Sequence, residues 1–465
     1  MTIDLGGIAV RFQNIPEFLS YHSFEIEASA DAHTVCRVSF KISLERVEEF
    51  ISLAELRKQV DITSDNGDRV MTGIVYSVTI DYGVGVAIAD MIITSKSIEY
   101  QEQGKERIFQ NPKKTFEDIL KAFPSVIIGK SEHLKDMVEE IIYQHNIDDF
   151  SFLVFLAGLC RTRVWINDTG EICFGLPGTK HSFDSKEKNR SRAILNRSLK
   201  AQKAGRVLDI ETLQQLPNGV EISLDQKEYT VCNVHILERY DETRFHYSGY
   251  TSPYPERSKT SVTLIAKARV TSQKDPDNLG RIQVQFMNFE DNDSDKSWIP
   301  VLTPFIGKNN GGIVTVPDEG DEVIVLISDG KAFIVNSIRK DTLPENCQDV
   351  SKKHIAIKDS IITLNEESIS IANQQSIMVL DDKSISSSVD KSSIKIEAES
   401  IESESGKSIL VLKDKLLQIE NGDSNLELEN GTTTLKGGSS NLSLDKGKTQ
   451  ISGSKIDFST QGFSI

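Results

Sequence analysis

Apolar residues near the C-terminus follow a strict eight-residue period. From Ser360 the chain divides into twelve octads; a Ser or Thr opens all but two, which begin with Leu416 and Lys448. Each octad carries a pair of mostly apolar residues spaced by two, so both side chains of the pair leave the same face of a strand. Alternate octads place the pair one residue earlier, which adds a second rhythm of sixteen. The first series is Ile362/Leu364, Met378/Leu380, Ile394/Ile396, Leu410/Leu412, Leu426/Leu428 and Leu442/Leu444; the alternate series is Ile369/Ile371, Ile385/Ser387, Ile401/Ser403, Leu417/Ile419, Thr433/Leu435 and Thr449/Ile451.

A fixed short period of strand plus polar corner predicts a β-helix or solenoid. Two inward side chains per octad are too few to fill a single-chain coil of usual girth. We therefore predict a three-chain intertwined β-helix in which each octad forms one face of a thin prism. Twelve strand spacings of roughly 4.8 Å make a needle on the order of 60 Å long. The alternative is a Ser-rich disordered tail, but disorder has no reason to keep an apolar period.

The earlier part of the chain predicts an α+β domain. Residues 20–95 alternate as strands, apart from a helical pattern over residues 43–59. Thr115 to Asp118 resembles a capping box at the start of a short helix, and Asp148 is placed to cap a second one.

Residues 262–338 change to short strands separated by turns. Five strands in about 75 residues predict a small closed barrel of the OB type. The predicted strands are Ala266–Val270, Arg281–Phe286, Trp298–Val301, Glu322–Ile327 and Ala332–Ile338.

Composition narrows the possible partners and compartment. The net charge of −16 argues against nucleic acid and against an anionic membrane surface. No apolar run approaches the roughly 20 residues of a membrane helix, so no stable membrane insertion is expected. Five scattered Cys suggest neither a disulfide framework nor a zinc site, and they fit a reducing cytoplasm. The N-terminus lacks the pattern of a signal peptide, so a needle that acts outside the cell needs another route of export.

At the predicted barrel the sequence resembles the VgrG spike family. The first barrel hairpin carries D-P-D followed by L-G-R, the next strand W-I-P-V, and a later turn P-D-E-G-D-E-V. The matching residues are Asp275, Gly280, Arg281, Trp298, Pro317, Gly320, Asp321 and Glu322. Two further stretches, Ile108–Asn111 and Gln144–Leu153, resemble the family's F-Q and Q-Y-N-E-S-D-F segments.

The resemblance implies a mainly β protein with phage-hub-like N-terminal barrels, an OB-fold barrel and a trimeric needle. The implied domains are a hub over residues 1–260, a barrel over 261–345 and a needle over 346–465. The expected partners are two further copies of the chain, an inner tube protein, baseplate subunits, a small tip protein and effectors. No catalytic residue, cofactor or metal is expected.

The sequence departs from the family pattern in several places. Lys308 to Gly312 replaces the usual G-W-G stretch, and Lys331 to Phe333 replaces an acidic, Pro-containing hairpin. The chain ends just past the needle, so we expect no appended effector domain. A tip partner is expected to contact Phe458, Phe463 and Ile465 near that end, unless these residues seal the needle core.

Two other functions fit parts of the sequence. A contractile phage tail uses the same hub and needle architecture. A β-helix enzyme that acts on polysaccharide would need paired carboxylates on one face, for which Glu397, Glu399, Glu402 and Glu404 are the nearest candidates. We interpret these carboxylates as a solvated face. His145 and His181 lack partners at metal-binding spacing, and Gly83 and Gly85 lack the third glycine of a nucleotide fingerprint.

Overall fold

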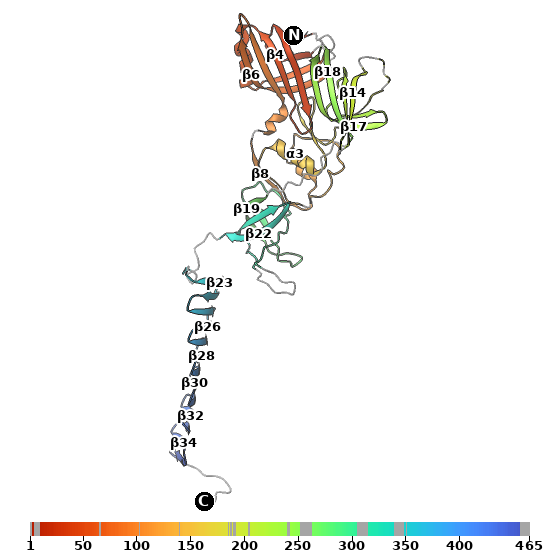
Figure 1. Ribbon diagram of the computed structural model, residues 1–465. Helices are drawn as coiled ribbons and strands as arrows, with labels where there is room; N and C mark the ends of the chain where they lie inside the picture. The colour runs from red at the N-terminus through yellow and green to blue at the C-terminus, as the bar shows by residue number, and fades with distance from the viewer. Residues whose placement is uncertain are drawn as a thin grey trace. The chain divides into compact units, whose positions relative to one another are not determined.

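The computed structural model is built mostly from strands, as predicted (Figure 1). It describes residues 2–3, 10–64, 67–101, 103–138, 140–184, 186, 188, 192–202, 205–239, 242–251, 263–304, 315–338, 348–349 and 351–455. The chain divides into two compact units, Met1–Arg339 and Lys340–Ile465. No helix in the described ranges is both long and apolar enough to cross a membrane.

A large, almost entirely antiparallel sheet dominates the first unit. Its described strands run in the order β1-β2-β5-β6-β7-β4-β3-β17-β18-β15-β14, with β16 beside β17 and β13 parallel to β16. One face packs on a core that includes Phe40, Phe50 and Tyr247. The strands are β1 (Thr2–Ile3), β2 (Val10–Gln13), β3 (Ser20–Ser29), β4 (Val35–Ile42), β5 (Gln59–Ser64), β6 (Arg69–Tyr82), β7 (Ala87–Ser95), β13 (Lys180–Ser182), β14 (Ile194–Gln202), β15 (Gly205–Thr212), β16 (Glu221–Leu224), β17 (Lys227–Arg239) and β18 (Glu242–Tyr250).

Short helices and two small sheets complete the hub part. The predicted caps are confirmed: Thr115 and Asp118 form a capping box, and the Asp148 side chain accepts a hydrogen bond from the Ser151 backbone N–H at 2.8 Å. The elements are η1 (Leu44–Arg46), α1 (Val47–Glu55), η2 (Lys96–Gln101), α2 (Phe116–Leu120), α3 (Asp149–Leu159), β8 (Lys105–Phe109) with β10 (Ile142–Ile147), and β9 (Ile127–Ile128) with β11 (Val164–Ile166) and β12 (Ile172–Phe174).

The OB barrel contains the sheet β20-β19-β21-β22. These strands are β19 (Leu264–Ser272), β20 (Gln283–Phe286), β21 (Glu322–Ser328) and β22 (Lys331–Ile338). The expected strand at Trp298–Val301 is reduced to isolated bridges, Ile299 to Ile282 and Val301 to Ile334. Pro300 within this stretch has no N–H to donate, which limits regular pairing. The segment still connects β20 to β22 and closes the barrel.

The repeats of the second unit form one antiparallel sheet in which every strand pairs with its neighbour in sequence. The strands are β23 (Lys353–Ile357), β24 (Ser360–Leu364), β25 (Ser368–Ala372), β26 (Ser376–Asp381), β27 (Ser384–Val389), β28 (Ser392–Glu397), β29 (Ser400–Ser405), β30 (Ser408–Lys413), β31 (Leu416–Asn421), β32 (Ser424–Glu429), β33 (Thr432–Gly437), β34 (Ser440–Asp445) and β35 (Lys448–Ser452). We refer to this sheet as the needle sheet.

This pairing differs from the expected winding, in which consecutive octads fall on different faces of a prism. An octad of about six strand residues and two turn residues has the length of a hairpin unit, so the chain turns back on itself. The sixteen-residue rhythm follows directly. Antiparallel pairing reverses the order of positions, so Ile362 pairs with Ile371 and Leu364 with Ile369. In an eight-residue repeat paired in this way, the apolar pair of one octad faces the apolar pair of the next only if the two pairs are offset by one residue within their octads.

Turns along one edge of the needle sheet are stacked by backbone hydrogen bonds. In four of these turns the first residue has a positive φ of 50–61° and donates its N–H to the turn sixteen residues earlier. The donor and acceptor pairs are Asp390 to Gln375, Gly406 to Lys391, Gly422 to Lys407 and Gly438 to Asp423, at 3.1–3.2 Å. The hydrogen-bond ladder therefore continues into the turns.

Neighbouring glycines test this turn geometry. Gly438 has a φ of 60°, whereas Gly437 lies in β33 without a positive φ, and an added Cβ meets no atom within 4 Å at either position. We expect Gly438→Ala to destabilise the needle sheet by about 1 kcal/mol, because an L-residue is strained in the left-handed region. Gly437→Ala is the matched control and should be neutral or slightly stabilising. Equal effects in urea unfolding followed by circular dichroism would contradict the turn assignment.

Candidate functional site

The needle sheet has one apolar face made of two parallel rows of side chains. The two residues that each octad contributes to this face are direct cross-strand partners of the corresponding two residues in the next octad. The rows therefore run the length of the sheet. The first row is Ile362, Ile371, Met378, Ser387, Ile394, Ser403, Leu410, Ile419, Leu426, Leu435, Leu442 and Ile451; the second is Leu364, Ile369, Leu380, Ile385, Ile396, Ile401, Leu412, Leu417, Leu428, Thr433, Leu444 and Thr449. Ile394 and Ile396, near the middle, are 49% and 40% exposed.

The opposite face of the needle sheet is mostly polar beyond β26. Lys395 Nζ lies 2.5 Å from Glu397, and Lys413 Nζ lies 3.4 Å from Glu402. Lys395 and Glu402 are also direct cross-strand partners. These pairs are half-exposed, so each contributes little stability. They mark this face as the polar one, and they pair two of the carboxylates considered for an enzyme site with lysines.

The motif residue Asp275 holds together the first barrel hairpin. Its carboxylate accepts hydrogen bonds from the backbone N–H groups of Asp277, Leu279 and Arg281, and from the guanidinium of Arg281 at 2.7 and 3.0 Å. Hydrogen bonds from the Arg281 side chain, aided by those from the backbone, lower the pKa of Asp275 well below 3.8. Gly280 completes the turn with a φ of 71°.

Asp275 should therefore make barrel stability depend on pH. A carboxyl group whose pKa falls on folding contributes stability that is present above its unfolded pKa and is lost as pH falls through its folded pKa. We expect Asp275→Asn to lower the melting temperature at neutral pH, and the difference from wild type to shrink below about pH 4. Thermal unfolding across pH measures this difference. Asp277→Asn, at the exposed end of the same cluster, should have a smaller effect, and a pH-independent difference for Asp275→Asn would count against the assignment.

Three of the remaining barrel motif residues, Pro317, Gly320 and Asp321, shape the turn before β21. The Asp321 carboxylate accepts a hydrogen bond from the Asp318 N–H at 3.0 Å, and Gly320 has a φ of 94°. The Pro317 carbonyl accepts from Gln273. The carboxylate of Glu322 is buried and lies 3.4 Å from Arg269. Trp298 is half-buried beside the bridging residue Ile299. The roles of these residues as family-motif positions stay predictions.

A buried polar network joins the F-Q segment to the OB barrel. Gln110 Nε2 donates to Asp291 at 2.6 Å and to the Val284 carbonyl at 3.1 Å. The carboxylate of Asp293 accepts from the backbone N–H groups of Gln110 and Asn111, at 2.9 and 3.0 Å. Lys296 Nζ lies 3.1 Å from the Asp291 carboxylate. We call the side chains of Gln110, Asp291, Asp293 and Lys296 the clamp. The Gln110 segment is recognisable in the sequence by its resemblance to the family, but its barrel partners are not, because no local pattern marks Asp291 or Asp293.

The second hub motif forms a network of its own at the start of α3. Asp149 accepts hydrogen bonds from Lys105 at 2.8 Å, from Gln144 at 2.9 Å and from Arg107 at 2.5 Å. Burial alone would raise the pKa of Asp149, but these hydrogen bonds outweigh it and lower the pKa. Arg107 also lies 3.3 Å from Glu290 of the barrel segment. Both motifs therefore fasten the hub part to the barrel.

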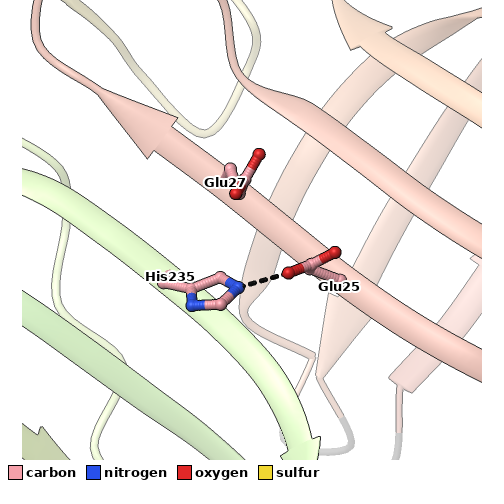
Figure 2. A group of neighbouring side chains, drawn as sticks. All are labelled: Glu25, Glu27 and His235. Carbon is pink, nitrogen blue, oxygen red and sulfur yellow. Dashed lines mark hydrogen bonds and ion pairs between the residues drawn. The ribbon is translucent and has the colours of Figure 1, made fainter.

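A separate cluster lies on the polar face of the large sheet. Figure 2 shows Glu25 and Glu27 on β3 facing His235 on β17, with His235 Nε2 lying 2.6 Å from Glu25 Oε1. The ligand atoms lie within 4.8 Å of one another, a spacing that a divalent cation could bridge. However, Arg37 donates to Glu27 at 2.7 Å and lies 4.0 Å from Glu25, so a cation already neutralises the carboxylates. The hydrogen bond from Arg37 also lowers the pKa of Glu27.

Some predicted positions lie outside the described residues. These are the expected tip contacts Phe458, Phe463 and Ile465, and the Lys308–Gly312 stretch.

Comparison with known proteins identifies the barrel and the fold. Residues 266–335 match the family described as the type VI secretion system/phage-baseplate injector OB domain. The E. coli c3393 protein, a type VI secretion component described as similar to the T4 bacteriophage tail proteins gp27 and gp5, aligns over 71% of this chain and 99% of its own, with a TM-score of 0.50 and 13% identity. The fold is that of a VgrG-like spike protein.

Two solved complexes extend the likeness. A structure described as a PdpA–VgrG complex, lidless, aligns over 87% of this VgrG-like chain and 98% of its own, with a TM-score of 0.52 and 12% identity. The lidded Francisella PdpA–VgrG complex aligns over 84% and 78%, with a TM-score of 0.51 and 11% identity. No curated protein sequence matches significantly. At these identities the likeness establishes the fold, including the predicted hub and OB architecture.

Proposed function

We propose that three copies of this VgrG-like chain form the central spike of a contractile injection machine. The observation that carries the proposal is the apolar face of the needle sheet, whose two rows run through twelve strands and stay substantially exposed in one chain. Soluble proteins rarely leave a contiguous apolar surface of this extent uncovered. Further copies of the same sheet, turned apolar face inward, cover it symmetrically. Three is the copy number that the resemblance to the VgrG family implies.

The polar face and the hydrogen-bond ladder suit a needle that must stay soluble and stiff. Each octad strand from β24 to β34 pairs with both neighbours, and the stacked turns continue the ladder along one edge. A sheet held in this way resists bending because bending stretches many hydrogen bonds at once. The machine's contraction would supply the work, and the needle would concentrate it on a small area of the target envelope.

The hub part and the needle end have different proposed partners. The hub would sit on the inner tube protein and the baseplate subunits. A small tip protein would cover the needle near Phe458, Phe463 and Ile465, and effectors would travel on either partner. We propose that the chain folds in the bacterial cytoplasm and leaves the cell, or enters a target cell, on contraction.

A phage tail hub and needle is the second candidate. The matched OB family covers both secretion systems and phage baseplates, so the barrel supports either assembly. The polysaccharide enzyme is less well supported, since Glu397 and Glu402 lie beside Lys395 and Lys413 on the polar face.

The test compares the full-length chain with a chain that ends at Ile338. Light scattering should give three times 51.8 kDa for the full chain and a loss or weakening of the trimer on truncation. In cells that carry the machine, the truncated chain should abolish delivery to target cells. A full-length monomer, or delivery that survives truncation, would rule out a needle-bearing spike. Assembly on an isolated phage tail would favour the second candidate.

A further inference from the structure

The two rows of the needle face are interrupted by four hydroxyl side chains, all in alternate octads. Ser387 and Ser403 lie in the first row, flanked across strands by Met378, Ile394 and Leu410. Thr433 and Thr449 lie in the second row, on either side of Leu444. Within the described part of the chain, no hydrogen bond joins these four hydroxyls to a partner. Each one is a polar group in apolar surroundings on the face that the proposed function turns inward.

The other octad series carries no such marker. Its twelve row positions, from Ile362 to Leu444, are all Ile, Leu or Met. Those octads would pack equally well if a neighbouring chain were displaced by one hairpin of sixteen residues. A repeat sheet of this kind is prone to slip because its register is weakly specified. Only the alternate octads distinguish one level of the needle from the next by the polarity of their row positions.

The positions of the four hydroxyls oppose such a slip. When one chain is displaced by one hairpin, each of its alternate octads lies beside the next alternate octad of the neighbouring chain. Five such octad pairs overlap, and in three of them the row residues differ in polarity. These three are Ile369/Ile371 with Ile385/Ser387, Ile401/Ser403 with Leu417/Ile419, and Leu417/Ile419 with Thr433/Leu435. Each mismatch leaves a hydroxyl facing an apolar side chain, and a buried hydroxyl without a partner is costly. In register, each hydroxyl meets the same hydroxyl of the other copies. A single polar residue in a coiled-coil core sets register for the same reason.

We propose that Ser387, Ser403, Thr433 and Thr449 set the register of the chains in the needle, through hydroxyl levels that hydrogen-bond between copies of this chain directly or through water. The inference rests on the proposed function, because it requires several needle sheets with their apolar faces together. It goes further in stating which positions select the aligned assembly, and which ones supply only apolar packing.

The test removes the four hydroxyls at nearly constant volume, with Ser387→Ala, Ser403→Ala, Thr433→Val and Thr449→Val. The control makes four comparable changes on the polar face, three Ser→Ala and one Thr→Val: Ser386→Ala, Ser388→Ala, Ser443→Ala and Thr434→Val. Two labelled pools of full-length chains are prepared for the otherwise unmodified chain, for the variant and for the control, all with Cys347→Ser. One pool carries a nitroxide at Glu404→Cys, and the other carries a gadolinium label at Lys436→Cys. The labelled positions are equivalent, exposed and two hairpins apart. The pools are unfolded together and refolded, and pulsed electron resonance measures the distance between unlike labels.

We expect one distance for the otherwise unmodified chain and for the control. The variant without the four hydroxyls should add distances in which the axial separation differs by about 10 Å, two strand spacings. A single unchanged distance in that variant would overturn the register proposal while leaving the spike intact. A complete absence of distances between unlike labels, together with a monomeric mass in the unmodified chain, would overturn the proposed function instead. If the fourfold variant does not refold, the Ser pair and the Thr pair are tested separately, and each should add slipped distances.

Discussion

Replacing Ile394 and Ile396 with lysine is expected to dissolve the trimer. Both side chains lie on the apolar face in the middle of the needle sheet. In a three-chain needle the change removes six isoleucines from the interior, each worth about 1.5–3 kcal/mol of burial. It also places six ammonium groups there, which cannot be buried without partners. Light scattering should show the mass falling from three times 51.8 kDa to 51.8 kDa.

The control for this experiment uses the other face of the same sheet. Ser393→Lys together with Ser443→Lys adds the same charge where Lys395 already faces solvent, and this variant should remain a trimer. Exposed charges on a sheet face typically change stability little. If the Ile394 and Ile396 variant keeps its mass while the hub also stays folded, the apolar face is not what holds the copies together.

Asp291→Ala is expected to destabilise the barrel strongly. The Asp291 side chain is fully buried and accepts hydrogen bonds from Gln110 at 2.6 Å, from Lys296 at 3.1 Å and from the Phe286 N–H at 3.3 Å. Its removal leaves the Lys296 ammonium, 12% exposed, and the buried Gln110 amide without this partner. Breaking a buried charge pair from one side typically costs about 3–5 kcal/mol. We expect a loss of that size in the free energy of unfolding of the first unit.

Tryptophan fluorescence during urea unfolding isolates this effect. Both tryptophans of the chain, Trp165 and Trp298, lie in the first unit, so the signal does not report on the needle sheet. Asp295→Ala is the matched control: its side chain is 58% exposed and lies 3.3 Å from Lys113. Loss of such a surface pair should cost less than about 1 kcal/mol. Comparable losses for the two variants would mean that the clamp does not stabilise the barrel.

Local pattern in the sequence was sufficient for much of the fold. Apolar residues spaced by two at an eight-residue period determine strands with one apolar face, whatever lies around them. Capping is equally local, and so Thr115 and Asp148 were correctly placed at helix starts. Five short strands between turns predicted the OB barrel. The D-P-D and P-D-E-G-D-E-V motifs carried the family resemblance and encode specific turns, such as the one that Asp275 and Arg281 hold. The division into hub, barrel and needle at residues 260 and 345 stays a prediction.

The tertiary structure decided which strands and side chains meet. The sequence shows the sixteen-residue rhythm, yet two arrangements satisfy an apolar period equally well: successive octads on successive prism faces, or successive octads paired in one sheet. The antiparallel partnership of Ile362 with Ile371 selects the second. Similarly, Gln110 meets Asp291 across 181 residues of sequence, and Glu25 meets His235 across 210, only after the chain has folded. Local spacing specifies the face on which a side chain lies; the partner it meets there depends on long-range pairing and burial, which no local pattern records.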